Sequence, residues 1–160
     1  MFDMSDEAYG YIYPVPHDND YKRLSEYISS TGAGFLEIDK NLYNFPEGIP
    51  LEKNILMFSI GDKPGYPNAT YLMDCYNFYD PETSNIGFPT NPNERLNLLL
   101  DIVENIFLLS KSKKMVIVLT DSEQIESTKK ISISEVRKII GEDFKKYQGA
   151  PDTLYEIRLD

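Results

Sequence analysis

Few side chains in this sequence could support nucleophilic or zinc-dependent chemistry. His17 is the only histidine and Cys75 is the only cysteine. A Ser-His-Asp triad would need His17 as its base, and no Gly-x-Ser-x-Gly motif is present to place a serine nucleophile. A zinc site usually takes several nitrogen and sulfur ligands, which one histidine and one cysteine cannot supply. We therefore expect neither a catalytic triad nor a metal site.

The most glycine-rich segment, residues 31–34, does not have the context of a nucleotide-binding loop. A phosphate-binding loop precedes a helix, because the amides at the helix N-terminus then face the phosphate. This segment instead follows an expected helix, and no Lys-Ser or Lys-Thr pair comes directly after it. We interpret it as the end of that helix and expect no cofactor.

Carboxylates offer the remaining route to catalysis. Asp74, Asp80 and Glu82 lie close together in the sequence, but their spacing does not match a calcium-binding loop. Asp121 follows the expected central strand, a position where α/β sheets often carry functional carboxylates. A small enzyme that uses Asp121, or Asp74 with Asp80, as acid and base is therefore an alternative hypothesis.

Tyrosine is concentrated in the first half of the chain, among loops rich in proline and glycine. Ten of the twelve tyrosines precede residue 80: Tyr9, Tyr11, Tyr13, Tyr21, Tyr27, Tyr43, Tyr66, Tyr71, Tyr76 and Tyr79. Tyrosine combines a rigid apolar ring with a polar hydroxyl, which suits a partly exposed recognition surface. The alternative is that these rings belong to the core and to the faces of a sheet, above all in an expected strand at 70–79.

The acidic charge is also concentrated in the first half. The chain has a net charge of −10, and residues 1–80 carry 13 acidic and 5 basic side chains. A negative field repels phosphate backbones and anionic lipid, so we expect neither nucleic acid nor a membrane as a partner. It would attract a basic protein.

The compartment is expected to be cytoplasmic. A single cysteine agrees with a reducing environment, and the N-terminus lacks the basic and apolar regions of a secretory signal. The longest apolar run is also too short to cross a bilayer.

In the first half, hydrophobic periodicity predicts one helix and three strands. The helix starts after His17, with Asp18 or Asn19 as its cap, and ends at Gly32. Strands are expected at 35–39, 54–60 and 70–79. The last two are joined by a loop rich in turn-forming residues, so we expect them to pair as an antiparallel hairpin.

The second half contains the clearest signals. Asn91 and Pro92 begin a long helix that is apolar on most of its surface and reaches Leu109. A continuous β-branched run at 115–119 predicts a central strand. Ser132 and Glu135 form a capping box for a helix that is followed by a strand at 153–159. The whole predicts one α+β domain over 1–160, a sheet of about five mostly antiparallel strands with about three helices packed on it.

In size, acidity and element order the chain resembles small bacterial immunity proteins of contact-dependent or polymorphic toxin systems. The resemblance covers the 91–109 helix leading into the 115–119 strand, and the 132–147 helix before the terminal strand. It implies a non-catalytic protein that neutralises a cognate toxin. Because immunity proteins span unrelated folds, no family site residue is transferred to this sequence.

The leading hypothesis is therefore an inhibitor whose acidic, tyrosine-rich surface binds a basic toxin such as a nuclease. A regulatory module that binds another cellular protein is a further alternative. The expected partner-binding residues are Asp18, Asp20, Asp62, Tyr66, Asp74, Tyr79, Asp80 and Glu82.

Overall fold

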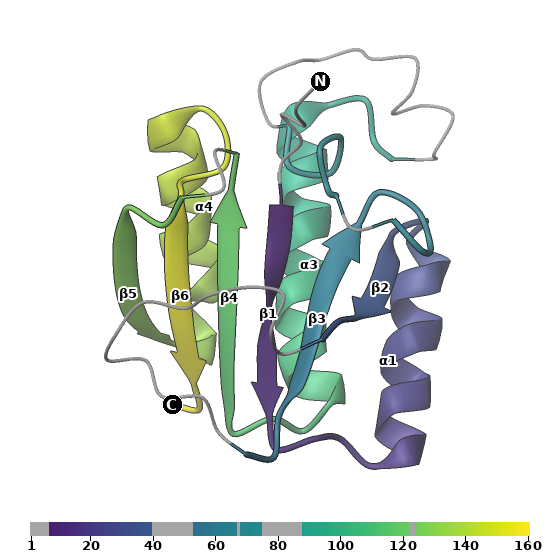
Figure 1. Ribbon diagram of the computed structural model, residues 1–160. Helices are drawn as coiled ribbons and strands as arrows, with labels where there is room; N and C mark the ends of the chain where they lie inside the picture. Colours follow the sequence, from purple (N-terminus) through teal and green to yellow (C-terminus); the bar gives the residue numbers. More distant parts are fainter. Residues whose placement is uncertain (1–6, 40–52, 67, 75–87, 122–123) are drawn as a thin grey trace.

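A computed structural model describes residues 7–39, 53–66, 68–74, 88–121 and 124–160 as one six-stranded sheet with helices on one side (Figure 1). The strands lie in the order β2-β3-β1-β4-β6-β5. Neighbours are antiparallel except β5 and β6, which are parallel. The strands are β1 (Glu7–Tyr13), β2 (Gly34–Glu37), β3 (Leu56–Gly61), β4 (Lys114–Thr120), β5 (Ser127–Ser132) and β6 (Thr153–Arg158).

Three α-helices cover one face of this sheet: α1 (Asp18–Ser30), α3 (Pro92–Leu109) and α4 (Val136–Tyr147). A short 3-10 turn, Ile133–Glu135, leads into α4. Helix α3 lies between the other two, since it contacts both α1 and α4. Within the part of the chain described here, no helix is both long and apolar enough to cross a membrane.

Local capping signals account for where two of the helices begin. The side chain of Asn91 accepts hydrogen bonds from the backbone N–H groups of Asn93 and Glu94, and Pro92 occupies the first turn. Glu135 accepts from the backbone N–H of Ser132 at 3.0 Å, which completes the expected capping box. The cap expected from Asp18 or Asn19 is wrong, because His17 holds the N-cap position of α1 without a side-chain bond.

The core lies between the helices and the sheet. Helix α3 buries Leu99, Ile102, Val103 and Ile106 completely, as its nearly continuous apolar surface predicts. Every residue of β4 is buried, which confirms the central strand expected from the run at 115–119. These α3 residues belong to the larger of two apolar clusters, together with Met115, Ile117 and Leu119 of β4. The alternate β4 residues Val116 and Val118 belong to the smaller cluster.

The α+β class and the mostly antiparallel sheet are confirmed, but the sheet has six described strands where about five were expected. Two strands were missed. Strand β1 pairs with both β3 and β4, and its centre reads Tyr-Gly-Tyr rather than an apolar run. Strand β5 is an edge strand with the polar sequence Ser-Thr-Lys-Lys-Ile-Ser, so it lacks a hydrophobic pattern.

The hairpin expected between 54–60 and 70–79 is wrong where it can be compared. Strand β3 pairs with β1 and β2 instead, and residues 70–73 form a turn. The buried carboxylate of Asp62 holds this turn, because it accepts the backbone N–H groups of Tyr71 at 3.0 Å and Leu72 at 2.9 Å. Residues 75–79 lie outside the described part of the chain.

Candidate partner-binding surface

Two of the acidic residues expected to bind a partner lie at the start of α1. Asp18 is its first residue and is exposed. Asp20 is buried and forms ion pairs with Lys111 at 3.5 Å and Arg23 at 3.9 Å. Of these two carboxylates, only that of Asp18 is accessible to another molecule.

Three further expected residues lie in the segment after β3. Tyr66 is 53% exposed, with the Lys63 ammonium 5.4 Å from the centre of its ring. Asp74 is partly buried, and its backbone carbonyl accepts a hydrogen bond from the Arg95 guanidinium. Burial raises the pKa of the Asp62 carboxyl, although its backbone hydrogen bonds act in the opposite direction. The remaining expected residues, Tyr79, Asp80 and Glu82, lie outside the described residues.

These two groups lie at opposite ends of the sheet. Strand β3 is antiparallel to β1, with Leu56 opposite Ile12 and Ile60 opposite Ala8. The start of α1 follows the end of β1, whereas the segment after β3 lies beside the beginning of β1 (Figure 1). The structure therefore does not bring Asp18 and Asp20 together with Asp62, Tyr66 and Asp74.

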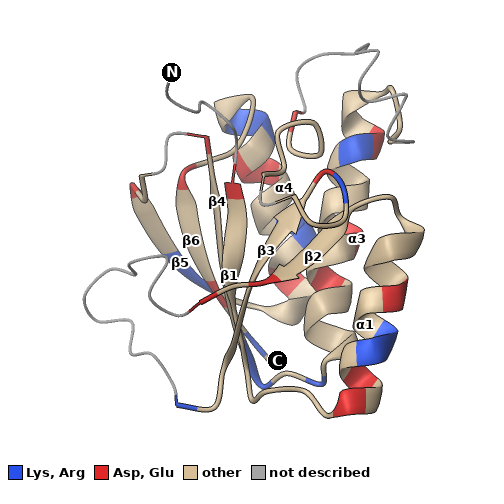
Figure 2. Ribbon diagram, turned by 45° about the vertical axis from the view of Figure 1, so that its right-hand side comes forward, with Lys and Arg blue, Asp and Glu red and all other residues tan. Residues whose placement is uncertain are grey.

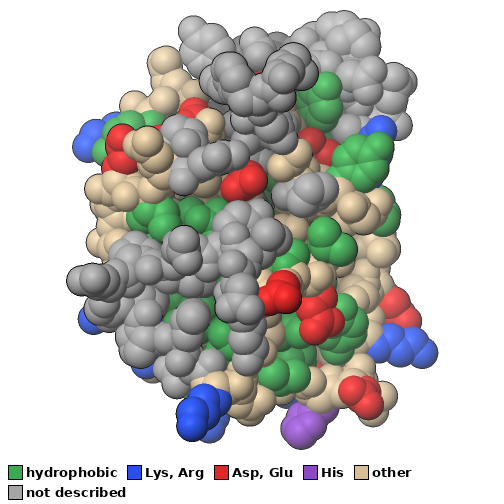
Figure 3. Space-filling view, viewed as in Figure 1, with side chains coloured by type: hydrophobic (Ala, Val, Ile, Leu, Met, Phe, Trp, Pro, Cys, Tyr) green, Lys and Arg blue, Asp and Glu red, His purple; other side chains and the backbone are tan. Residues whose placement is uncertain are grey.

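The tyrosines in the described part of the chain do not gather on one surface either. Tyr9 and Tyr11 are buried in the second apolar cluster, with side chains such as Val116 and Val118 of β4. In the view onto the side of the sheet opposite the helices, acidic side chains appear at several separate places (Figure 3). For Tyr9 and Tyr11, the alternative of sheet-face tyrosines is the one that the structure supports.

A different acidic and aromatic surface is formed where α1 and α3 pack together. Asp101, Glu104 and Leu108 follow each other at helical spacing along the outer side of α3. Leu108 is 55% exposed, and Tyr27 of α1 lies half-buried beside Asn105. We call these five residues, Tyr27, Asp101, Glu104, Asn105 and Leu108, the α1–α3 surface. Figure 2 shows acidic segments on both helices of this layer.

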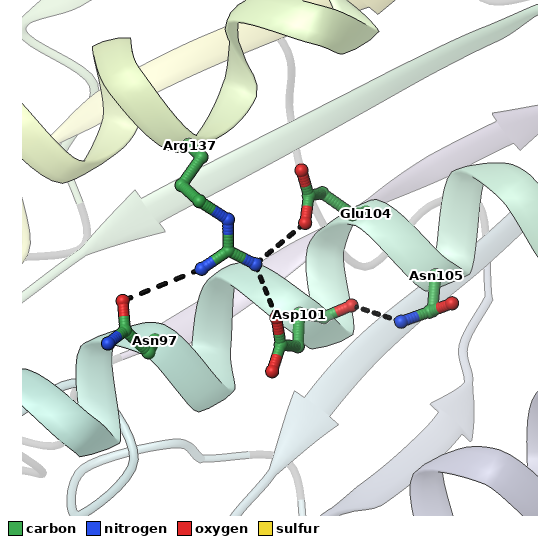
Figure 4. Close-up of polar contacts among 5 residues, drawn as sticks. All are labelled: Asn97, Asp101, Glu104, Asn105 and Arg137. Carbon is green, nitrogen blue, oxygen red and sulfur yellow. Dashed lines mark hydrogen bonds and ion pairs between the residues drawn. The ribbon is translucent and has the colours of Figure 1, made fainter.

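Arg137 of α4 fixes the two carboxylates of this surface. Its guanidinium donates to Glu104 at 2.7 Å, to Asp101, and to the side-chain oxygen of Asn97 at 3.5 Å (Figure 4). Burial alone would lower the pKa of this guanidinium, but the bonds with Glu104 and Asp101 raise it above its ordinary value. Arg137 therefore stays charged and restricts the rotamers of both carboxylates.

Tyr27 presents a neutral hydroxyl to the same carboxylates. Burial raises the pKa of its phenol, a hydrogen bond with Asn105 lowers it, and the charges of Asp101 and Glu104 raise it further. The net pKa is above its ordinary value of 10.0, so the hydroxyl remains protonated at neutral pH. The sequence gives one sign of this surface, because Asp101, Glu104 and Asn105 interrupt the apolar pattern of the helix. Their contact with Tyr27 and Arg137 depends on tertiary packing.

The carboxylates around Asp121 are the site of the alternative, catalytic hypothesis. Asp152 accepts hydrogen bonds from the Thr120 hydroxyl at 2.7 Å and from the backbone N–H of Asp121 at 3.0 Å. Partial burial raises the pKa of the Asp121 carboxyl, and the negative charge of Asp152 raises it further. Asp152 has φ of 50°, so its backbone is left-handed where the chain turns into β6. This pair joins the end of β4 to that turn.

Another group of ionisable side chains lies between β5, α4 and β6. The Asp143 carboxylate accepts the Tyr155 hydroxyl at 2.7 Å and the Lys129 ammonium at 2.8 and 2.9 Å. Burial and the adjacent Asp143 charge raise the pKa of Tyr155 far above its ordinary range. Among the described residues, no group of three or more His, Cys, Asp or Glu side chains could hold a metal ion.

Comparison with models of known families, with curated proteins and with solved structures gives no match.

Proposed function

We propose that this chain acts by binding another protein, as a non-catalytic inhibitor that neutralises a basic toxin domain such as a nuclease. The observation that carries this proposal is the α1–α3 surface. It places an exposed leucine and a half-buried tyrosine beside two carboxylates that Arg137 already holds in position.

Each component of this surface has a function in binding. Aromatic and apolar side chains at the centre of an interface supply most of its affinity, because they lose contact with water on docking. Carboxylates set the orientation of a basic partner and speed its approach. Since Arg137 restricts Asp101 and Glu104 before the partner arrives, little side-chain entropy is lost when they bind.

The charge of the whole chain supports the same class of partner. A net charge of −10 attracts a basic protein over several ångströms and repels an acidic one. A nuclease is a suitable basic target, because its own active site has to attract phosphate.

The test is the association rate with candidate basic toxin domains, starting with any encoded by the reading frames that flank this gene. We expect the rate to fall steeply as salt is raised. The double variant Asp101→Asn/Glu104→Gln should associate several-fold more slowly at low salt, and its rate should fall less steeply with salt than that of the wild type.

The control is Glu37→Gln/Glu126→Gln, which removes two exposed carboxylates outside the α1–α3 surface and gives the same net charge. If both double variants slow association equally, the effect belongs to total charge, and the α1–α3 surface is not the docking site. If the wild-type protein does not bind the toxin domain, the inhibitor proposal fails.

A carboxylate-dependent enzyme is the second candidate, and the raised pKa of Asp121 beside Asp152 favours it. Such an enzyme should lose its activity in Asp121→Asn while keeping its fold. Binding through the α1–α3 surface should be unchanged in the same variant. Asp121→Asn alone therefore distinguishes the enzyme from the inhibitor. A regulatory module would use the α1–α3 surface for a cellular protein and would not protect against a toxin.

A further inference from the structure

A groove of about 250 Å³ runs between α3 and α4 on the outer side of the helical layer. Its floor is formed by Leu96 and Leu100 of α3 and by the backbone of Gly141 on α4. A Cβ atom at Gly141 would lie 3.6 Å from the Leu100 side chain, so the glycine leaves room for about one methyl group in ordinary contact with the apolar floor. The groove is thus separate from the α1–α3 surface, and Arg137 lies between the two.

The walls of this groove are mainly cationic although the chain as a whole is acidic. Arg137, Lys138 and Lys145 line it, together with one carboxylate, that of Glu142. Asp101 and Glu104 offset the charge of Arg137. Lys138 and Lys145 are exposed and form no ion pair within the described part of the chain.

The two ends of the groove differ in their electrostatics. Helices α3 and α4 are antiparallel, because Arg137 at the start of α4 reaches Glu104 while Lys145 near its end shares the groove with Asn93. Asn93 belongs to the first turn of α3, where the helix dipole is positive. An anion is therefore favoured at the Lys145 end and disfavoured near Asp101 and Glu104.

We propose that this groove binds a small apolar monocarboxylate. The hydrocarbon part lies against Leu96, Leu100 and Gly141, and the carboxylate pairs with Lys145 beside Asn93. An apolar cavity of about 150 Å³ is large enough for benzene. The 250 Å³ of this groove accordingly accommodates one ring with a short acidic arm. Pockets for drug-sized ligands and cofactors are commonly larger, at about 300–1,000 Å³.

The test is an NMR titration of the ¹⁵N-labelled full chain with 3-phenylpropionate. For a ligand of this size we expect saturable binding at about millimolar concentration, with shifts centred on the Gly141 and Leu100 amides. Lys145→Glu should weaken binding about tenfold, because a solvent-exposed attraction between Lys145 and the ligand carboxylate is replaced by a repulsion. Lys138→Glu should have a smaller effect, since Lys138 lies toward the other end.

Lys146→Glu is the matched control. It makes the same charge change one residue away, and Lys146 is directed over the Tyr147 ring rather than into the groove. We expect it to change the affinity less than twofold. Gly141→Leu should abolish binding by filling the groove, provided that circular dichroism shows an intact fold. If it does not fold, the comparison of Lys145→Glu with Lys146→Glu decides the question.

Three further ligands test the chemistry. The amine 3-phenylpropylamine has the same ring and chain with the opposite charge, and propionate lacks the ring, so both should bind at least fivefold more weakly. The peptide acetyl-Ala-Ala-Phe with a free C-terminus distinguishes a chain terminus from a free acid as the source of the carboxylate. The proposal would be overturned if 3-phenylpropionate and 3-phenylpropylamine bound equally well, or if Lys145→Glu and Lys146→Glu had equal effects. It would also be overturned if neither 3-phenylpropionate nor the peptide gave a saturable shift.

Discussion

Buried acidic residues in this protein form internal contacts, so acidity alone does not identify a binding residue. Asp20 pairs with Lys111, Asp62 holds a backbone turn, and Asp143 accepts from Tyr155 and Lys129. A buried carboxylate with such partners is costly to remove, because its partners are then left without an acceptor. At the residue scale, stability measurements can therefore separate structural acids from acids that face a partner.

Asp62→Ala should lower the free energy of unfolding by about 2 kcal/mol, since the backbone N–H groups of Tyr71 and Leu72 lose their acceptor. Asp18→Ala, at an exposed position, should change it by less than about 0.5 kcal/mol. Urea unfolding followed by circular dichroism measures both values. Equal effects of the two substitutions would contradict the structural role of Asp62.

Asp121→Asn should stabilise the protein at neutral pH but not in acid. The pKa of Asp121 is raised in the folded protein above its ordinary value of 3.8, so the folded state binds the proton more tightly than the unfolded state. Stability is therefore lost as pH rises from 3.8 through the folded pKa. Asparagine resembles the protonated carboxyl and removes this loss.

Unfolding in urea at pH 3 and pH 7 would measure this difference. The gain from Asp121→Asn should be present at pH 7 and absent at pH 3, below the ordinary pKa of an aspartate. A gain of the same size at both pH values would show that Asp121 does not titrate abnormally.

At the scale of elements, β1 is an interior strand that joins β3 to β4. Gly10 at its centre is required for this pairing, because a Cβ atom there would lie 1.8 Å from the Val116 carbonyl oxygen. Backbone atoms of β4 cannot move aside without breaking the strand pairing.

Gly10→Ala should therefore destabilise the protein by about 3 kcal/mol or more, or prevent it from folding. Gly141→Ala is the control, and we expect it to raise the stability of the protein rather than lower it. Its Cβ would make an ordinary contact and would favour the helix by about 0.5–1 kcal/mol. Thermal unfolding compares the two variants, and a stable Gly10→Ala protein would contradict the close approach of β1 to β4.

The elements with a strong local signal were predictable from the sequence. Capping residues and periodicity predicted α3 and α4, and a continuous apolar run predicted β4. Strand β1 was missed because tyrosines around a glycine resemble a loop as much as a strand. Strand β5 was missed because its pairing with β6 is encoded by tertiary packing rather than by an apolar pattern.

The candidate surface shows the same division between local and tertiary information. The polar positions of α3 are visible in its sequence pattern, because carboxylates interrupt leucines and isoleucines at helical spacing. The contacts of these positions with Tyr27 and Arg137 cannot be read from the sequence, because Arg137 lies 36 residues from Asp101 along the chain. The expected binding surface rested instead on the number of acidic and tyrosine residues in the first half of the chain. It therefore grouped residues that lie at opposite ends of the sheet.

At the scale of the whole molecule, the helical layer presents two neighbouring surfaces of different character. The α1–α3 surface combines carboxylates with Tyr27 and Leu108, whereas the groove beside α4 is lined mainly by cations. Arg137 lies between them and forms ion pairs toward α3. A basic protein partner that docks on the α1–α3 surface would leave the groove open to its own ligand.

The most direct test compares two exposed leucines as contacts for the basic toxin domain that this chain is proposed to bind. Leu108 and Leu159 are 55% and 58% exposed, so serine at either position should leave the fold intact. Calorimetry should show that Leu108→Ser weakens binding at least tenfold, because an anchor at the centre of an interface typically contributes about 2 kcal/mol or more. Leu159→Ser should bind as the wild type does. Wild-type affinity in Leu108→Ser, or an equal loss in both variants, would contradict the assignment of the docking face to α1 and α3.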